Sequence, residues 1–181
     1  MGNMVPAFVK AMEDYKADFP SFAERGWGAT VKAERWNGRH VMFGWLVFWI
    51  TAYCKGHGLL PDPSVLLDLS QWGPVASLGD STPISQQRAI VLVAHIHVLF
   101  VSIAAAIAPF SFQDKLLLEP GEADDAPAGL FPPMAPGLTK DAEIWNGRVA
   151  MVGLICLVAQ AVGTKTPILD VVNMWFGSLF Y

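Results

Sequence analysis

The chain has 181 residues, of which 53% are hydrophobic and only 15% are charged. Soluble domains carry about 25% charged residues, so the composition excludes an ordinary soluble domain and predicts one membrane-embedded domain over residues 1–181. The net charge is only −4 and the sequence contains no basic cluster, which excludes a nucleic-acid partner. Cys54 and Cys156 lie within apolar runs, so we expect two buried free thiols.

The first part of the chain combines charged and apolar residues. Residues 1–31 carry apolar side chains at helical spacing, and we expect an amphipathic segment on the membrane surface. The first spanning helix is predicted at about residues 33–55, and it is long enough to cross only if the charged residues at its beginning enter with it. The Arg35 side chain can extend back to the interface, whereas Glu34 and Arg39 need partners.

Two further spanning helices are predicted at about residues 84–108 and 139–163, with Thr139 or Asp141 capping the second of them. Loops rich in proline and glycine separate the three spans. The tail, residues 167–181, is amphipathic and is expected to form a short helix that lies flat at the membrane surface. Lysine and arginine residues are concentrated on the side of the N-terminus, so this side is predicted to face the cytoplasm or the plastid stroma.

One motif occurs twice and relates the first helix to the third. Residues 33–44 and 142–153 align at an offset of 109, and eight of the twelve positions are identical. One span separates the two copies, so both helices run in the same direction and a pseudo-two-fold axis along the membrane normal can relate them. The predicted fold is an all-α membrane protein with three transmembrane helices, the first and third of them crossed, and a short amphipathic C-terminal helix.

Each copy of the motif places a glutamate and an arginine at the head of an apolar run. Glu34 and Arg39 are separated by ~140° around one helix, so they do not pair locally. The two-fold relation instead predicts reciprocal ion pairs that lock the crossing of the helices. These pairs are Glu34 with Arg148 and Glu143 with Arg39. Glycines in both copies permit close approach of the backbones or of a flat ligand, namely Gly38, Gly44, Gly147 and Gly153.

Amide side chains in the same motif add oxygen donors. Asn37 lies ~60° around the helix from Glu34, and Asn146 stands in the same relation to Glu143. Gln160 returns to within ~40° of the Asn146 face, ~21 Å further along the third helix. Carboxylate and amide oxygens suit a hard ion such as Mg2+. Single oxygen ligands at different depths are typical of an array of bound magnesium macrocycles rather than of one catalytic centre.

At these residues the chain resembles the light-harvesting chlorophyll-binding superfamily, the three-helix antenna proteins of plastids. The pattern Glu-x-x-His/Asn-x-Arg-x-Ala-Met of that family is matched in part by the first copy and completely by the second. The matching residues are Glu34, Asn37, Arg39 and Met42 in the first copy, and Glu143, Asn146, Arg148, Ala150 and Met151 in the second. The short chain and the Trp-Asn-Gly-Arg of both copies resemble antennae of the red-algal lineage and, within it, the RedCAP group.

The resemblance implies that Glu34 and Glu143 are axial ligands of chlorophyll magnesium while they pair with arginines. Asn37, Asn146 and Gln160 would ligate three more chlorophylls. The implied cofactors are chlorophyll a, a second chlorophyll of type c or b, and xanthophyll carotenoids. The implied partners are neighbouring antenna subunits and a photosystem core, with photosystem I favoured over photosystem II. The implied location is the plastid thylakoid membrane, crossed several times, with the N-terminus in the stroma.

Histidines are further candidate ligands. His95 and His97 lie in the second span and point ~160° apart, so they cannot hold one metal together. Each is a candidate either for ligating a separate chlorophyll or for an interhelical hydrogen bond. His40 and His57 are secondary candidates, and Trp175 occupies the approximate place of a tail histidine ligand in some family members.

The resemblance implies a light-harvesting antenna rather than an enzyme, and no nucleophile–base pair or phosphate loop stands out in the sequence. A photoprotective role on the same scaffold is the first alternative, which the small number of acids on the lumenal side disfavours. These acids are Asp62, Asp68 and Asp80. A haem-binding redox subunit using His95 and a purely structural membrane protein are further alternatives. The acidic run of the second loop is either a solvated face or a docking surface, formed by Glu119, Glu122, Asp124 and Asp125.

Overall fold

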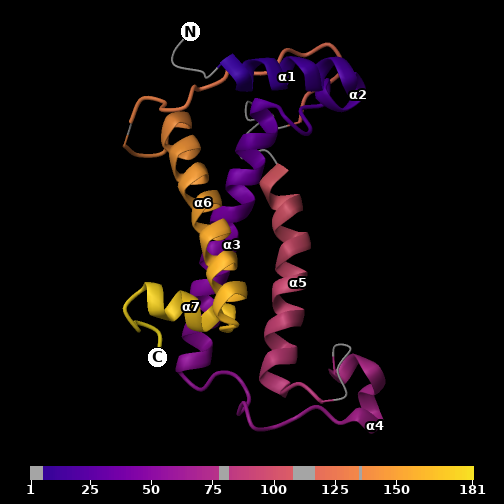
Figure 1. Ribbon diagram of the computed structural model, residues 1–181, viewed down its shortest axis with the longest axis vertical. Helices are drawn as coiled ribbons and strands as arrows, with labels where there is room; N and C mark the ends of the chain where they lie inside the picture. Colours follow the sequence, from indigo (N-terminus) through magenta and orange to yellow (C-terminus); the bar gives the residue numbers. More distant parts are fainter. Residues whose placement is uncertain (1–5, 78–81, 108–116, 135) are drawn as a thin grey trace. The chain divides into compact units, whose positions relative to one another are not determined.

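The computed structural model describes residues 6–77, 82–107, 117–134 and 136–181 (Figure 1). Within these ranges the chain forms helices and loops, and the sole β-type pairing is an isolated antiparallel bridge between Leu66 and Ser85. The all-α class predicted from the sequence is therefore confirmed. The predicted end of the second span at residue 108 lies outside the described residues, as does Asp80.

Three long helices begin and end within two residues of the predicted limits, as far as the described residues extend. They are α3 (Val31–Gly56), α5 (Gln86–Ile107) and α6 (Lys140–Thr164). Among the described helices, α6 and the Gln86–Ala104 part of α5 are long and apolar enough to cross a membrane. With 26 residues, α3 is about 39 Å long, but it is not among the helices that meet this criterion. That α3, α5 and α6 all span the membrane therefore stays a prediction.

Four shorter helices accompany them: α1 (Pro6–Asp18), α2 (Pro20–Ala23), α4 (Leu69–Trp72) and α7 (Ile168–Trp175). Pro20 separates α1 from α2 because proline is favoured in the first turn of a helix and excluded from its interior. Asp68 caps α4 by accepting a hydrogen bond from the Ser70 amide, and the 3-10 turn Gly73–Ser77 follows. The predicted amphipathic segments at both ends of the chain are thus helical.

The described residues group into two compact units, and each of the three long helices contributes to both. Unit 1 consists of residues 1–43 and 102–155, and unit 2 consists of residues 44–101 and 156–181. The first unit contains α1, α2, the beginning of α3, the end of α5 and the beginning of α6. The second contains α4, α7 and the remaining parts of the long helices.

In unit 1 the two repeated helices begin with the same cap. The Thr30 hydroxyl accepts a hydrogen bond from the Ala33 amide, and the Thr139 hydroxyl accepts one from the Ala142 amide, both at 3.1 Å. Threonine is a preferred N-cap because its hydroxyl satisfies an amide that has no partner in the first helical turn. The predicted cap at Thr139 is confirmed, and the repeat extends back to a threonine three residues before each shared alanine.

The beginnings of α3 and α6 approach each other closely at one glycine from each motif copy. A Cβ atom built on Gly38 would lie 2.9 Å from the Gly147 Cα atom, and the reverse distance is 3.0 Å. Glycine is required at both positions because backbone faces backbone. A Cβ atom built on Gly44 would meet no other described part of the chain within 4 Å, so Gly44 does not contribute to this close approach.

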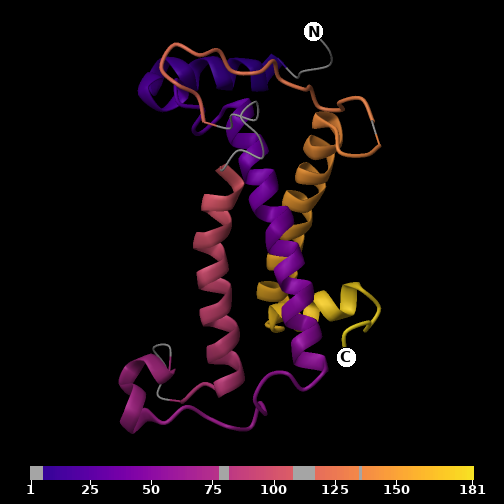
Figure 2. The same ribbon diagram turned by 180° about the vertical axis from the view of Figure 1, so that it is seen from behind.

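In unit 2 the C-terminal helix α7 packs against the end of α3. Its buried face consists of Leu169, Val171, Val172 and Asn173. Trp45 of α3 stacks on Trp175, with ring centroids 6.2 Å apart, and α7 lies beside α3 in both ribbon views (Figures 1 and 2). The Asn173 side chain fixes the C-terminal turn by contacting the backbone of Phe180 and Tyr181. Cys54 and Cys156 are free, as predicted, but neither is buried, since Cys54 is half-buried and Cys156 is exposed on α6.

Candidate ligand-binding site

The first reciprocal ion pair joins Glu34 of α3 to Arg148 of α6. The Arg148 Nε atom donates to Glu34 Oε1 at 2.5 Å. The same guanidinium donates through Nη1 to the carbonyl oxygens of Gly129 at 2.6 Å and Leu130 at 2.9 Å. Arg148 therefore neutralises Glu34 and also fastens the loop that precedes α6. Glu34 Oε2 has no partner within the described part of the chain.

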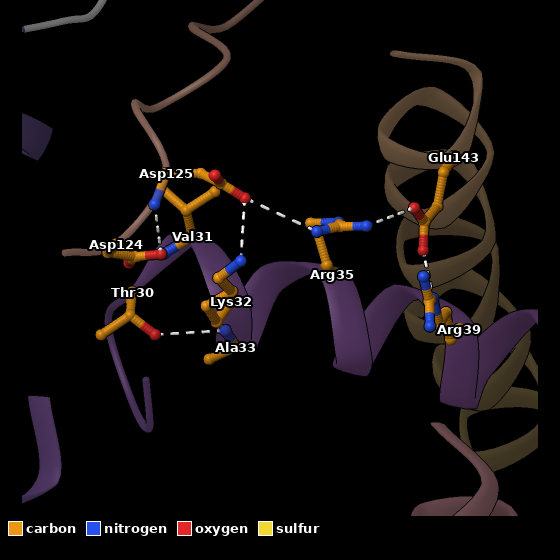
Figure 3. A network of polar contacts seen from close by, with 9 residues as sticks. All are labelled: Thr30, Val31, Lys32, Ala33, Arg35, Arg39, Asp124, Asp125 and Glu143. Atoms are coloured by element: carbon orange, nitrogen blue, oxygen red, sulfur yellow. Dashed lines mark hydrogen bonds and ion pairs between the residues drawn. The ribbon is translucent and has the colours of Figure 1, made fainter. Parts of the chain in front are cut away.

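The second ion pair is not a copy of the first, because two arginines hold Glu143. Arg39 Nε donates to Glu143 Oε1, and Arg35 Nη2 donates to Glu143 Oε2 at 3.0 Å (Figure 3). The repeat places Ile144 where the first copy has Arg35. Both Glu143 oxygens are thus engaged, whereas Glu34 keeps one oxygen free of side-chain partners.

Arg35 does not extend back to the interface, and this expectation is wrong. Its side chain is only 6% exposed and lies between Glu143 and Asp125. The Asp125 Oδ2 atom is 3.6 Å from Arg35 Nη1. Asp125 also accepts a hydrogen bond from Lys32 at 3.0 Å, and this bond, opposed by partial burial, lowers the pKa of the Asp125 carboxyl. Two acidic partners make it favourable to bury Arg35, whereas an isolated arginine would need to reach water.

The acidic run of the second loop serves partly to anchor that loop to α3. Asp124 Oδ2 accepts a hydrogen bond from the Val31 amide at 2.8 Å, and Asp125 pairs with Lys32 and Arg35 (Figure 3). A carboxylate at this position satisfies an unpaired amide and interacts favourably with the helix dipole. Asp124 and Asp125 therefore stabilise the contact between the loop and α3, and they form neither a merely solvated face nor a free docking surface.

A pocket of about 490 Å3 lies beside the Glu34–Arg148 pair in unit 1. Glu34, Asn37 and Arg148 line it, together with apolar side chains from α1 and the loop before α6. Its volume falls within the usual range of about 300–1,000 Å3 for small-molecule sites. The Asn37 amide has no hydrogen-bond partner within the described residues. The pocket thus combines an apolar wall with a carboxylate oxygen and an amide that are both available to a ligand.

The remaining amide candidates differ from each other. Asn146 is exposed on α6 and has no side-chain partner in the described ranges. Gln160 Oε1, by contrast, accepts a hydrogen bond from Trp175 Nε1 at 2.7 Å. An amide oxygen has two lone pairs, so this bond orients the Gln160 side chain and leaves one lone pair for a ligand. Trp175, which the resemblance placed near a tail ligand position, serves in the structure as a hydrogen-bond donor to Gln160.

The histidines lie in separate environments. His95 contacts Thr51 of α3, His97 points away from it, and His40 contacts Ser102 at the end of α5. His57 stacks on Tyr53 with ring centroids 3.8 Å apart. Among the described residues, no three His, Cys, Asp or Glu side chains come together. The four histidines therefore do not form a shared metal site within the described residues.

Sequence reasoning missed three residues that build this site. Thr30 could have been found, because it precedes Ala33 by the same spacing that relates Thr139 to Ala142. Asp124 and Asp125 gave no such signal, since they lie 93 residues from their partners at the head of α3. Only the folded chain brings this loop to the beginning of the helix.

The ion pair, the glycine contact and the adjoining pocket give the beginnings of α3 and α6 the features of a candidate ligand-binding site. Comparison with known proteins shows which family this is. A family model described as Chlorophyll A-B binding protein matches residues 6–162. Because the match covers most of the sequence, the chain belongs to the chlorophyll A-B binding protein family, whose members are pigment-binding proteins rather than enzymes.

A curated relative is the low molecular mass early light-inducible protein HV60, chloroplastic, of Hordeum vulgare. The two sequences are 35% identical over 68 residues, a segment that covers 38% of this chain and 37% of the relative. The matched segment therefore spans well under half of either protein.

Proposed function

We propose that this chain is a light-harvesting antenna protein that binds chlorophylls and carotenoids in the thylakoid membrane and passes excitation energy to a photosystem core. The observation that carries the proposal is the pocket at the helix crossing. There Glu34 is neutralised by Arg148 through one oxygen, while the other oxygen and the Asn37 amide are available. Membership of the chlorophyll A-B binding family supplies the chemical class of the ligand.

The residues present fit a chlorophyll. Its magnesium ion would be held by a hard oxygen donor, and neutral amide oxygens and an arginine-paired carboxylate are suitable ligands. A paired carboxylate also avoids an uncompensated charge within the membrane. Glu34, Asn37, Asn146 and Gln160 each keep a lone pair for such a bond. When bound, the chlorophylls supply the absorption and transfer of excitation, and the chain supplies their positions.

Glu143 is proposed as a weaker ligand than Glu34. Arg35 and Arg39 each donate a hydrogen bond to one of its oxygens. The remaining lone pairs are polarised toward two positive charges, so they are weaker donors to a metal. The two motif copies are therefore proposed to hold chlorophylls of different affinity, although their sequences predict equivalent sites.

The finer features of the proposal rest on the resemblance to the light-harvesting superfamily. We propose chlorophyll a with a second chlorophyll of type c or b, xanthophyll carotenoids along the crossed helices, and photosystem I as the favoured partner. The chain crosses the membrane three times. The N-terminus and the charged beginning of α3 lie on the stromal side. The internal pairing of the α3 charges supports this topology, because the ion pairs at its head remove most of the cost of entry.

Photoprotection on the same scaffold is the second candidate function. A protein that senses lumenal acidification needs carboxyls that become protonated at mildly acidic pH. In the loop after α3, hydrogen bonds from Ser64 and Ser70 lower the pKa values of Asp62 and Asp68. These carboxylates therefore stay ionised, and the described acids of this loop support harvesting rather than pH-controlled quenching.

Pigment analysis of the mildly solubilised protein tests the proposal. Several chlorophylls and carotenoids per chain, with energy transfer from carotenoid to chlorophyll in the fluorescence excitation spectrum, are the expected result. The Asn37→Leu variant should lose one chlorophyll, whereas Gln71→Leu, at an exposed amide in α4, should lose none. A haem spectrum or a colourless protein would overturn the proposal.

The same preparation separates the two candidate functions. An antenna should show a long chlorophyll fluorescence lifetime that is unchanged when the pH is lowered from neutral to mildly acidic. A lifetime that shortens strongly on acidification would instead favour photoprotection.

A further inference from the structure

The structure treats the two neighbouring histidines of α5 differently. His95 Nε2 lies 3.0 Å from the Thr51 hydroxyl of α3. That hydroxyl also contacts the carbonyl oxygen of Val47 at 2.8 Å. In either tautomer of the ring, the His95 Nε2 atom is engaged by Thr51, as donor or as acceptor. The His95 ring also packs edge-on against Phe48, with centroids 5.3 Å apart. His95 is thus a hydrogen-bonded link between α5 and α3.

His97 has its hydrogen bond on the other ring nitrogen. Its Nδ1 atom lies 2.8 Å from the carbonyl oxygen of Val93, one turn earlier in the same helix. A carbonyl oxygen only accepts, so Nδ1 carries the proton and Nε2 of the neutral ring carries a lone pair. That lone pair has no partner within the described residues. A backbone carbonyl behind Nδ1 is also the arrangement that orients a metal-binding imidazole.

The surroundings of His97 are apolar and open. The residues three, four and seven positions away on the same face include Ile90, Val93, Phe100 and Val101, which are 45%, 53%, 68% and 63% exposed. His97 lies eleven residues after the start of α5 and ten before its end, which is about 15 Å from either end. This depth is the middle of a ~30 Å hydrocarbon layer, where water cannot satisfy the lone pair.

We propose that His97, through Nε2, is the axial ligand of a magnesium tetrapyrrole whose ring covers this apolar face of α5. The assignment rests on the proposed function for the class of pigment, and it selects one of two histidines that the sequence leaves equal. A magnesium ion satisfies the exposed lone pair, and the macrocycle covers side chains that the described residues leave largely exposed. His95 takes no pigment, because Thr51 occupies its Nε2 and Phe48 covers its ring.

The test compares three substitutions in the full chain, assembled with chlorophyll and carotenoid and purified in mild detergent. His97→Leu is expected to lose one chlorophyll per chain, with a matching band in the absorption difference spectrum, while far-ultraviolet circular dichroism stays unchanged. His97→Gln restores an oxygen donor and is expected to recover that chlorophyll in part. His95→Leu is the matched control, which should keep the full number of chlorophylls and lower thermal stability.

The outcomes distinguish the possibilities. Unchanged chlorophyll content in His97→Leu would overturn the proposal, and so would loss of the same chlorophyll from His95→Leu. A His97→Leu variant that fails to fold, or that keeps all chlorophylls but no longer associates with a neighbouring subunit, would show a structural or interface role and would also overturn it. A wild-type protein without chlorophyll would instead refute the proposed function itself.

Discussion

The unequal pairing of the two motif glutamates leads to a quantitative prediction. Removing one partner of a buried ion pair costs about 3–5 kcal/mol, because the other charge stays buried without compensation. Arg148 and Glu34 keep side-chain exposures of 24% and 28%, so Arg148→Leu should cost about 3 kcal/mol, at the lower end of that range. This corresponds to roughly a 100-fold fall in the folding equilibrium constant, and pigment is lost with the fold.

Arg39→Leu is the matched comparison from the other copy. Glu143 keeps Arg35 at 3.0 Å when Arg39 is removed, so the expected cost is about 1.5 kcal/mol, the loss of one charge-assisted hydrogen bond. Combining Arg39→Leu with Arg35→Met leaves Glu143 without either arginine and should raise the cost to about 3 kcal/mol.

The assay is equilibrium unfolding of the pigmented protein in a denaturing detergent, followed by circular dichroism. Equal costs for Arg148→Leu and Arg39→Leu would refute the reasoning from unequal pairing. An Arg148→Leu variant that folds with every pigment bound would refute the reciprocal pairing altogether.

Three further predictions follow from the described contacts. Gln160→Leu should remove one chlorophyll and leave the fold intact, and an unchanged pigment stoichiometry would exclude Gln160 as a ligand. Gly38→Ala should sharply lower stability, because the new Cβ would lie 2.9 Å from the Gly147 backbone, whereas Gly44→Ala has open space and should be tolerated in the same unfolding measurement. For Asp170, burial acts to raise the pKa of the carboxyl, but hydrogen bonds from Lys55 and Tyr181 outweigh it and lower the pKa below 3.8. The stability that this carboxylate gives the C-terminal tail should therefore be complete above pH 3.8 and be lost only as the pH falls further through the lowered pKa. Limited proteolysis of the tail at a series of pH values can check this.

In unit 1 the repeat in the sequence predicts some contacts of the two motif copies correctly and others incorrectly. The repeat predicts two equal ion pairs, and the glycine contact and the threonine caps are indeed alike in both copies. Arg35 breaks the equality because Asp125 makes its burial favourable. The repeat could not reveal this, since the loop that carries Asp125 belongs to neither copy.

In unit 2 the sequence likewise leaves the surroundings of single side chains undetermined. Helical periodicity places His95 and His97 on opposite faces, but it does not say which face meets α3. The Thr51 contact decides this and thereby leaves the lone pair of His97 free of partners in the described structure. The bond from Trp175 to Gln160 likewise depends on where α7 docks.

The sequence by itself determined the helical class, the limits of the long helices and the family, and it named the candidate oxygen donors. These features depend on composition, on the 3.6-residue period and on the spacing within one repeated motif, all of which are local. Only the tertiary structure decided which donors keep a free lone pair, because each is either engaged or left open by segments distant in the chain. The loop carrying Asp124 and Asp125, the Thr51 hydroxyl and the docked α7 make that selection, and no short-range pattern encodes their positions.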